Sequence, residues 1–381
     1  MNEINVKQNL NSEIKYCKKC VMPNTRPGIV FDNQDVCSAC RNYEKRETID
    51  WKKRWDELKQ LCDKYRSKDG SHDCMIAVSS GKDSHYQIYV MKELMGMNPL
   101  LVSADTLFSW TETGRKNFKN LGESFGCDVI TLTLNSKINR KMVRVGFEEW
   151  GRAAYPMDLA IYVYPIRMAI NFNIPLLVYG ENVSYEYGGY QTKETYSCKE
   201  QIMNDVTKPI DFDFWAKRGV HRKDLNQFIY PSVEEINESK IDPIYLSYFA
   251  PWNSYQHYLI AKQWGFRDLG NEWKRAGHLD DFTQIDTVGY LMDAWLKYPK
   301  FGHQQVTDIA SRMVRYGYMT RAEAVEAANK EDYKLDDKIL DDFLAFTGYS
   351  NREFWEILEK FWNRDIFEKV NGEWKLKNKL K

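Results

Sequence analysis

The stretch Ala77-Val78-Ser79-Ser80-Gly81-Lys82-Asp83-Ser84 decides how the rest of the sequence is interpreted. It follows an apolar run over 74–78 and precedes a helical pattern that starts at His85, so it predicts a strand, a tight loop and a helix. A loop of small residues at a helix N-terminus presents free backbone N–H groups and the positive end of the helix dipole, which together bind phosphate. The Lys82 ammonium and the serine hydroxyls add donors. The stretch therefore predicts an anion site.

The loop is not a Walker A motif. Ile76 stands where that motif has its first glycine, and Asp83 stands where it has serine or threonine. An ordinary turn of serine and glycine that opens a helix is the alternative interpretation.

Composition and charge exclude several classes of protein. The chain has 381 residues, of which 43% are hydrophobic, enough for two domains with a substantial core. Its 54 basic and 54 acidic residues cancel, so net charge gives no reason to expect a nucleic-acid or anionic-membrane partner. No apolar run approaches the roughly 18 residues that span a bilayer, and the polar N-terminus lacks a signal-peptide pattern. We therefore expect a soluble, cytoplasmic protein.

Four of the eight cysteines form two Cys-x-x-Cys pairs near the N-terminus. Sixteen residues separate Cys17 and Cys20 from Cys37 and Cys40, a spacing that lets four thiolates converge on one tetrahedral ion. A closed four-thiolate site leaves no position for a substrate, so structural zinc is favoured over catalytic zinc or an iron–sulfur cluster. The scattered remaining cysteines are interpreted as buried, inert thiols.

Residues 74–180 alternate apolar strands with amphipathic helices, which is typical of a doubly wound parallel sheet. The predicted strands are 75–79, 100–104, 129–132 and 175–179, and the predicted helices are 84–96, 113–125, 137–150 and 158–171. A helix over 49–66 precedes them. The expected domains are a zinc ribbon over 1–48, an α/β domain over 49–240 and a mostly helical domain over 241–381.

Ligands of doubly wound sheets bind beyond the carboxyl ends of the strands, which selects three loops. The first is 79–84. The second starts at Asp105, whose side chain could contact an adenosine. The third, 180–189, contains Glu181 and Glu186, two carboxylates able to hold magnesium or to position an attacking amine. A solvated surface turn is the alternative interpretation of this third loop.

The last third of the chain is predicted to be mostly helical. The segments 320–323 and 350–353 fit the capping-box pattern at helix starts. Before them, two lysines and a histidine interrupt the helical pattern: Lys297, Lys300 and His303. They are candidates for an anion clamp, with an ordinary charged turn as the alternative.

The 79–84 loop resembles the pyrophosphate-binding loop, Ser-Gly-Gly-x-Asp-Ser, of the PP-loop ATP pyrophosphatase superfamily. This resemblance implies an adenine nucleotide alpha hydrolase-like sheet. The departure is Ser80, which stands where the second position of the motif is usually glycine. A side chain fits there only if the backbone conformation permits one.

Four stretches together are similar to the N-acetyl sugar amidotransferases of bacterial surface-polysaccharide and nonulosonic-acid pathways. They are 17–23 with 37–41, which hold both cysteine pairs; 79–87; 180–189; and 280–321, which includes Gln284-Ile285-Asp286 and Asp308-Ile309-Ala310-Ser311-Arg312. Membership implies conversion of a sugar acetamido group to an acetamidino group, driven by ATP with Mg²⁺ through an adenylated imidate.

The resemblance also implies roles for residues of the selected loops. The candidate catalytic residues are Lys82, Asp83, Glu181 and Glu186. The candidate ATP and pyrophosphate ligands are Ser79, Ser80, Gly81, Lys82, Asp83, Ser84, Asp105 and Gly180. The candidate sugar ligands are Tyr187, Gly188, Gly189, Lys297, Lys300 and His303.

The expected partner is a separate glutaminase subunit that supplies ammonia. The three predicted domains account for the chain length, and Asn2 stands where an N-terminal-nucleophile glutaminase has cysteine. Two other interpretations stay open. One is a tRNA-thiolating enzyme, which also combines such a loop with Cys-x-x-Cys pairs, and the other is a zinc-ribbon scaffold without catalytic activity.

Overall fold

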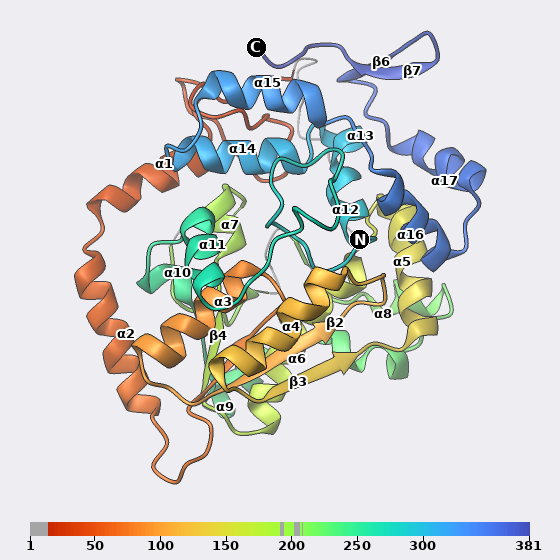
Figure 1. Cartoon of the computed structure of the whole chain (residues 1–381). Helices are drawn as coiled ribbons and strands as arrows, with labels where there is room; N and C mark the ends of the chain where they lie inside the picture. The colour runs from red at the N-terminus through yellow and green to blue at the C-terminus, as the bar shows by residue number, and fades with distance from the viewer. Residues whose placement is uncertain (1–13, 191–193, 202–205, 208) are drawn as a thin grey trace.

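The computed structural model describes residues 14–190, 194–201, 206–207 and 209–381. In that part of the chain, five strands form one parallel sheet with the order β3-β2-β1-β4-β5 (Figure 1). The strands are β1 (Cys74–Ala77), β2 (Pro99–Asp105), β3 (Val129–Thr133), β4 (Leu176–Tyr179) and β5 (Asp242–Tyr245). The predicted α/β class and its parallel sheet are confirmed.

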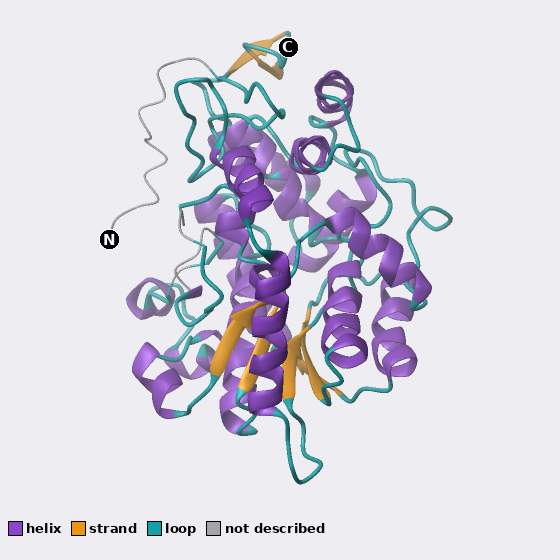
Figure 2. Ribbon diagram, turned by 90° about the vertical axis from the view of Figure 1, so that its left-hand side faces the viewer, coloured by secondary structure: helices purple, strands orange, loops and turns teal. Residues whose placement is uncertain are grey.

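Helices cover both sides of this sheet (Figure 2). Ile76 and Val178 pack on one side with residues of α2 (Trp51–Tyr65), α3 (Lys82–Ile88) and α4 (Glu112–Phe125). The alternate residues Met75 and Leu177 pack on the other side with α6 (Tyr155–Asn171). The strands are apolar runs because both of their faces are buried.

The fifth strand corrects the sequence prediction. The boundary expected at residue 240 assigns 242–245 to the helical domain, but these residues pair with β4. Asp242 and Pro243 disfavour strands, so this short run carries no strand pattern. Proline is tolerated because β5 lies at the edge of the sheet. The sheet therefore extends past the predicted boundary.

The helices of the α/β region lie close to their predicted positions. Those over 49–66, 113–125, 137–150 and 158–171 are α2, α4, α5 (Ser136–Trp150) and α6. The one predicted over 84–96 is α3 followed by a π-helical turn, η2 (Tyr89–Leu94). The polar region before β5 holds short helices, namely α7 (Val183–Tyr187), α8 (Phe212–Ala216), η4 (Arg222–Asp224), η5 (Asn226–Phe228) and α9 (Val233–Glu238).

The C-terminal region is mostly helical, as predicted. Both capping boxes are present, with Thr320 and Ser350 as N-caps. The helices are α10 (Leu246–Phe249), α11 (Ser254–Gln263), α12 (Leu291–Trp295), α13 (Lys297–Phe301), α14 (Gln305–Arg315), α15 (Arg321–Glu331), α16 (Asp337–Thr347), α17 (Asn351–Leu358) and η6 (Glu359–Phe361). A hairpin of β6 (Phe367–Val370) and β7 (Glu373–Leu376), which the sequence did not predict, follows them. The connection 264–290 between α11 and α12 contains no helix or strand.

The cysteine-rich segment lies beside the C-terminal helices (Figure 1). It contains α1 (Ser38–Lys45) and η1 (Arg46–Thr48), and its turns are joined by bridges between Tyr16 and Pro23 and between Phe31 and Cys37. Its α1 packs against α7, which follows β4. The ribbon is therefore in contact with one of the predicted ligand loops.

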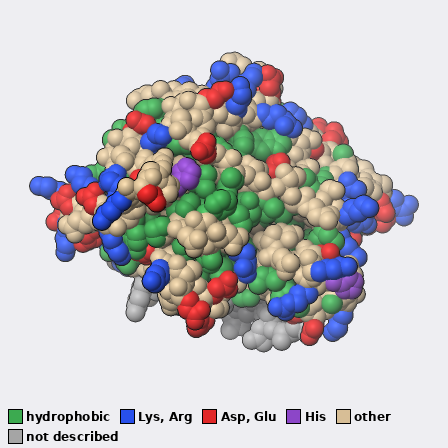
Figure 3. All heavy atoms as spheres, turned by 90° about the horizontal axis from the view of Figure 1, so that it is seen from below, with side chains coloured by type: hydrophobic (Ala, Val, Ile, Leu, Met, Phe, Trp, Pro, Cys, Tyr) green, Lys and Arg blue, Asp and Glu red, His purple; other side chains and the backbone are tan. Residues whose placement is uncertain are grey.

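The surface agrees with the balanced net charge. Figure 3 shows acidic and basic side chains interspersed over the face seen from below Figure 1, around a central group of hydrophobic side chains. Among the helices of the described residues, none has both the length and the apolar composition required to cross a bilayer.

Candidate active site

Two of the predicted ligand loops leave the sheet from neighbouring strands. The 79–84 loop follows β1 and the 180–189 loop follows β4, and these two strands are paired in parallel. The chain continues from β1 toward β2 and β3 on one side, and from β4 toward β5 on the other. The two loops therefore open at the point where the strand order reverses, which is where doubly wound sheets bind ligands.

The 79–84 loop is shaped by its own hydroxyl groups. The Ser79 N–H donates to Ser84 Oγ over 2.8 Å, and the Gly81 N–H donates to Ser79 Oγ over 3.2 Å. Because α3 begins at Lys82, the N–H groups of its first turn have no acceptor within the helix. These N–H groups and the positive end of the helix can bind an anion.

Ser80 fits its position without the conformational freedom of glycine. It is absent from the residues with positive φ, so its backbone conformation is one that tolerates a side chain. The buried Ser80 hydroxyl donates to Asp286 Oδ1 over 2.5 Å. Asp286 is fixed in turn, because its carbonyl accepts from the Thr111 N–H over 3.0 Å. Ser80 thus ties the loop to the connection 264–290.

Asp286 occupies part of the space next to the loop. A Cβ on Gly114 would lie 2.5 Å from the Asp286 carbonyl oxygen, so the start of α4 is closely packed against this residue. Burial raises the pKa of the Asp286 carboxyl, while hydrogen bonds from Ser80 and Ser79 and the charge of Lys82 oppose that rise. An incoming anion therefore meets a loop whose hydroxyl donors already have a protein acceptor.

The Lys82 ammonium is buried among carboxylates. The Lys82 side chain is 4% exposed, and its Nζ lies 2.8 Å from Asp83 Oδ2. The other oxygen of Asp83 accepts from Nδ1 of His257 over 2.7 Å. Burial alone would raise the pKa of Asp83, but Lys82 and His257 outweigh it and hold that pKa below its usual value. Asp83 is therefore ionised.

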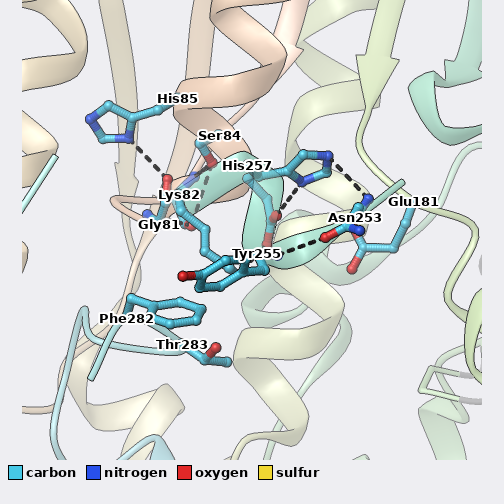
Figure 4. Close-up of polar contacts among 12 residues, drawn as sticks. Gly81, Lys82, Ser84, His85, Glu181, Asn253, Tyr255, His257, Phe282 and Thr283 are labelled. Atoms are coloured by element: carbon cyan, nitrogen blue, oxygen red, sulfur yellow. Dashed lines mark hydrogen bonds and ion pairs between the residues drawn. The ribbon is translucent and has the colours of Figure 1, made fainter. Parts of the chain in front are cut away.

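Aromatic residues border the ammonium. Figure 4 shows the Lys82 side chain reaching toward Tyr255 and Phe282, with Glu181 on the side of His257. The Lys82 Nζ lies 5.9 Å from the centre of the Phe282 ring, within the range of a cation–π contact. A cation placed in this way is attracted to the aromatic face while its charge remains available to an anion.

In the 180–189 loop, Glu181 is the carboxyl that joins the charged group formed by Lys82 and Asp83. Burial, followed by the charges of Asp83 and Glu186, raises the pKa of Glu181 to about 7. The Tyr187 hydroxyl donates to Glu181 Oε1 over 3.3 Å, and Arg312 Nη1 donates to that hydroxyl over 3.5 Å. A carboxyl that titrates near neutral pH can serve as a general acid or base.

In the 180–189 loop, Glu186 and Gly188 have structural partners. Buried Glu186 forms an ion pair with Arg46 of the ribbon. Gly188 has φ +76°, and a Cβ there would lie 2.6 Å from the Ala39 N–H nitrogen, while the Gly188 carbonyl accepts from the Ser38 hydroxyl over 3.1 Å. Close packing of the ribbon therefore accounts for this glycine, which the sequence assigned to the sugar.

Gly180 and Gly189, which lie on either side of α7, also have close packing contacts. A Cβ on Gly180 would lie 2.8 Å from the Trp252 ring. Gly189 donates its N–H to the Ser184 carbonyl over 2.6 Å and lies against Gly28 of the ribbon, where a Cβ on Gly28 would lie 3.1 Å from the Gly189 Cα. The Trp252 contact requires a small residue at position 180 whether or not a ligand is bound.

The other predicted ligands lie around the site with partners of their own. Asp105 accepts from the Trp110 indole over 2.9 Å at the end of β2. Lys300 Nζ donates to the Gly151 carbonyl over 2.7 Å and so caps the end of α5, and burial lowers its pKa to about 8. Lys300 therefore has a structural role in this fold, which its position in the sequence did not reveal.

Lys297 and His303 lie beside Asp308 of α14. The Lys297 Nζ is 2.8 Å from Asp308 Oδ2, and His303 Nδ1 is 3.6 Å from Asp308 Oδ1. Burial lowers the pKa of the His303 ring to about 4, so this ring is neutral at physiological pH. Arg312 Nε donates to the Asp308 carbonyl over 3.3 Å, which connects this cluster to Tyr187 and Glu181. The expected clamp is thus an ion pair of Lys297 with Asp308 beside a buried, neutral His303, rather than a set of free cations.

The four N-terminal cysteines converge as predicted. Their buried sulfurs lie within 4.8 Å of one another. Two of the separations are 3.9 Å, between Cys17 and Cys40, and 3.7 Å, between Cys20 and Cys37. A tetrahedral zinc ion with Zn–S bonds of about 2.3 Å requires sulfurs about 3.8 Å apart. The Cys37 N–H also points at Cys17 Sγ over 3.3 Å, so the site fits zinc.

Comparison with known proteins connects the C-terminal part of the chain to polysaccharide biosynthesis. Residues 276–381 match the family model for the C-terminal domain of WbpG-like LPS biosynthesis proteins. The matched segment includes Asp286, Lys297 and Arg312. A stretch of 117 residues is 26% identical to the uncharacterized protein MJ1599 of Methanocaldococcus jannaschii, and it covers 30% of this chain and 42% of that protein. The match to the family model supports involvement in LPS biosynthesis.

Several residues of the site were not among the sequence-predicted candidates. They are Arg46, His257, Asp286, Asp308 and Arg312. Three of them, Asp286, Asp308 and Arg312, lie in stretches that carry the family resemblance, which was the available signal. His257 lies in a helix whose sequence pattern shows only aromatic density, and no local signal connects it to Asp83.

We predict that the protein binds about one zinc ion per chain and that Cys37→Ser abolishes this binding, because serine replaces one of four thiolates. Atomic absorption on protein purified without chelator measures the zinc content. Cys127→Ser is the matched control, since Cys127 is an isolated, partly buried thiol outside the cluster. Full zinc content in the Cys37 variant would contradict the assignment.

We also predict that Ser80→Ala destabilises the fold by about 1–3 kcal/mol, because it leaves the buried Asp286 carboxylate without its hydroxyl donor. Urea unfolding gives the free energy. Adding Asp286→Asn to Ser80→Ala should cost less than the sum of the two single changes, as expected for residues in contact. Ser136→Ala, at an exposed serine, should change stability by less than about 0.5 kcal/mol. Strict additivity of the two changes would show that the contact is not formed.

Proposed function

We propose that this protein is an ATP-dependent amidotransferase that converts the acetamido group of an N-acetyl sugar to an acetamidino group during LPS biosynthesis. The observation that carries the proposal is the buried Lys82 ammonium at the start of α3, beside a Glu181 carboxyl that titrates near neutral pH. The C-terminal match to WbpG-like proteins supports the pathway, and the PP-loop resemblance of residues 79–84 supports the use of ATP.

The reaction must activate a poor electrophile. The amide oxygen attacks the α-phosphorus of ATP, the bond to the β,γ-pyrophosphate breaks, and the amide carbon becomes an adenylated imidate. Ammonia adds to this carbon, AMP departs with the former amide oxygen, and loss of a proton leaves the amidine. These steps need charge stabilisation and orientation but no protein nucleophile.

The residues of the site match these needs. Lys82 and the first-turn N–H groups of α3 would stabilise the charge on the departing pyrophosphate. Asp83 presents a hard carboxylate of the kind that binds Mg²⁺ together with phosphates, and such an ion would neutralise phosphate charge. Glu181, as a carboxylate, would accept the proton released when ammonia attacks.

The four-cysteine site has a different role in this proposal. Zinc held by four thiolates has no open position, so it supports structure and does not take part in the reaction. The Ser38 and Arg46 contacts to 186–188 hold α7 and the loop that contains Glu181. The ribbon would therefore act by positioning the 180–189 loop.

Ammonia would come from a separate glutaminase subunit, because free ammonia is scarce at neutral pH. The tRNA-thiolation alternative is less well supported by the thiols. Cys62, Cys74 and Cys198 are buried, and burial raises the pKa of each thiol, which makes them poor carriers of sulfur.

The direct test is incubation of the purified protein with ATP, Mg²⁺ and ammonium chloride and a panel of free and nucleotide-linked N-acetyl sugars. Mass spectrometry detects the replacement of oxygen by NH, and pyrophosphate release is measured in parallel. We expect sugar-dependent release of pyrophosphate together with the amidine. In a parallel assay with ATP, Mg²⁺, tRNA and a sulfur donor in place of the sugar and ammonium, formation of thiolated tRNA would favour the thiolation alternative.

We predict that Lys82→Ala reduces pyrophosphate release by about 100-fold or more, because it removes the ammonium that stabilises the leaving group. Circular dichroism checks that the variant is folded. The matched control is Lys119→Ala, since Lys119 is an exposed lysine paired with Glu123. Turnover of the Lys82 variant at the rate of the unmodified protein would overturn the assignment.

We predict that kcat/KM rises with pH through about 7, because Glu181 accepts a proton only in its ionised form. Glu181→Gln should lower kcat by about 10²-fold or more and remove this rise. A pH–rate profile measured at saturating ATP and at a constant concentration of free NH3 tests both effects. A rise that persists unchanged in the Gln variant would assign the titration to another group.

The same pKa has a consequence for stability. Folding raises the pKa of Glu181 from 4.5 to about 7, so folding favours the protonated form. Its contribution to stability is complete below pH 4.5 and is lost as the pH rises through about 7. The difference in unfolding free energy between the unmodified protein and Glu181→Gln should therefore change over this interval, which gives a check independent of catalysis.

A further inference from the structure

His257 of α11 joins the 79–84 loop from 174 positions away in the sequence. Its Nδ1 lies 2.7 Å from Asp83 Oδ1, and Asp83 Oδ2 lies 2.8 Å from the Lys82 ammonium. Asp83 is thus held between two donors on different elements. This contact joins α11 to the first turn of α3.

The surroundings of the His257 ring fix its orientation. The ring is 1% exposed and stacks on Tyr86, with ring centres 3.8 Å apart and planes 12° apart. Trp252 packs its ring edge-on at 4.4 Å and 78°. These neighbours prevent rotation of the ring, so its two nitrogens keep fixed partners.

The hydrogen bonds also fix the position of the proton on the ring. His257 Nε2 accepts from the Asn253 N–H over 3.4 Å, so in the neutral ring the proton is on Nδ1. Nδ1 therefore donates to Asp83.

A hydrogen-bond donor to Asp83 at this position affects how fully the Asp83 carboxylate neutralises the Lys82 ammonium. Without it, the Asp83 carboxylate would be free to turn toward Lys82 with both oxygens and to neutralise the ammonium more fully. With it, one oxygen is fixed on His257, so Lys82 keeps a single carboxylate contact. In metal and phosphate sites, a hydrogen-bond donor that holds one oxygen of a carboxylate ligand in this way orients that carboxylate.

We propose that His257 is a positioning residue that holds Asp83 in the orientation required for binding ATP with Mg²⁺ at the 79–84 loop. The proposal rests on the proposed function only in that this loop binds ATP. It extends that function by assigning a role to an α11 residue outside the loops that follow β1, β2 and β4.

The test is isothermal titration calorimetry of the full chain with ATP at several Mg²⁺ concentrations, without sugar or ammonia. His257→Ala should weaken binding of ATP with Mg²⁺ by about tenfold or more. His257→Asn, whose amide nitrogen can replace Nδ1 as donor to Asp83, should bind within about threefold of the unmodified protein. His257→Gln, whose amide reaches the position of Nε2 instead, should bind as weakly as the Ala variant. The matched control is His221→Asn, at an exposed histidine.

A purely structural histidine would give a different pattern. If the Asn and Gln variants bind equally well, or if the Ala variant binds as the unmodified protein does, the proposal is overturned. If the Ala variant does not fold, the comparison of Asn with Gln still decides. In a background of Asp83→Asn, His257→Ala should have little further effect on binding, because the carboxylate to be positioned is gone.

These measurements separate this inference from the proposed function. Binding of ATP that depends on His257, with no amidine formed from any sugar, would reject the amidotransferase reaction and keep the positioning role. Amidine formation that is insensitive to the choice of Ala, Asn or Gln at residue 257 would support the amidotransferase reaction and reject the positioning role.

Discussion

A single buried ammonium organises the site. Lys82 is 4% exposed, and a charge removed from water to this extent requires partners of opposite sign. The fold supplies carboxylates from separate elements, namely Asp83 beside it, Glu181 after β4, and Asp286 from the connection 264–290. Burial raises the pKa of both Glu181 and Asp286, and around Glu181 the excess negative charge of Asp83 and Glu186 adds to that rise. A divalent cation brought with a phosphate ligand would relieve the same excess.

The sheet and the ribbon bring these groups together by different means. The parallel pairing of β1 with β4 places their following loops at one edge, since parallel strands all end at the same side. The ribbon is too small to build a large core, and four thiolates on one ion would hold it in place of that core. Gly188 then lets the ribbon approach the 180–189 loop closely, and Arg46 forms an ion pair with the buried Glu186.

Local patterns in the sequence were sufficient for most of the elements, though not for β5 or the β6–β7 hairpin, and they did not predict the contacts between elements. The apolar strands, the loop at the start of α3 and the cysteine pairs depend on neighbours within a few residues, and all were found where predicted. The contacts of Asp83 with His257 and of Ser80 with Asp286 join residues 174 and 206 positions apart, and no periodicity encodes them. Gly188 shows a related limit, because its conformation signals a turn and a close contact but not the partner, and in the structure the ribbon makes such a contact.

The burial of two loop residues is compatible with the proposed chemistry. An adenylated imidate can be attacked by water as well as by ammonia, so an enzyme that forms one must limit the access of water to it. Ser80 is fully buried and Lys82 nearly so, and the connection 264–290 lies against the 79–84 loop through Asp286. Under the proposed function, the tether between Ser80 and Asp286 therefore serves the reaction as well as the fold.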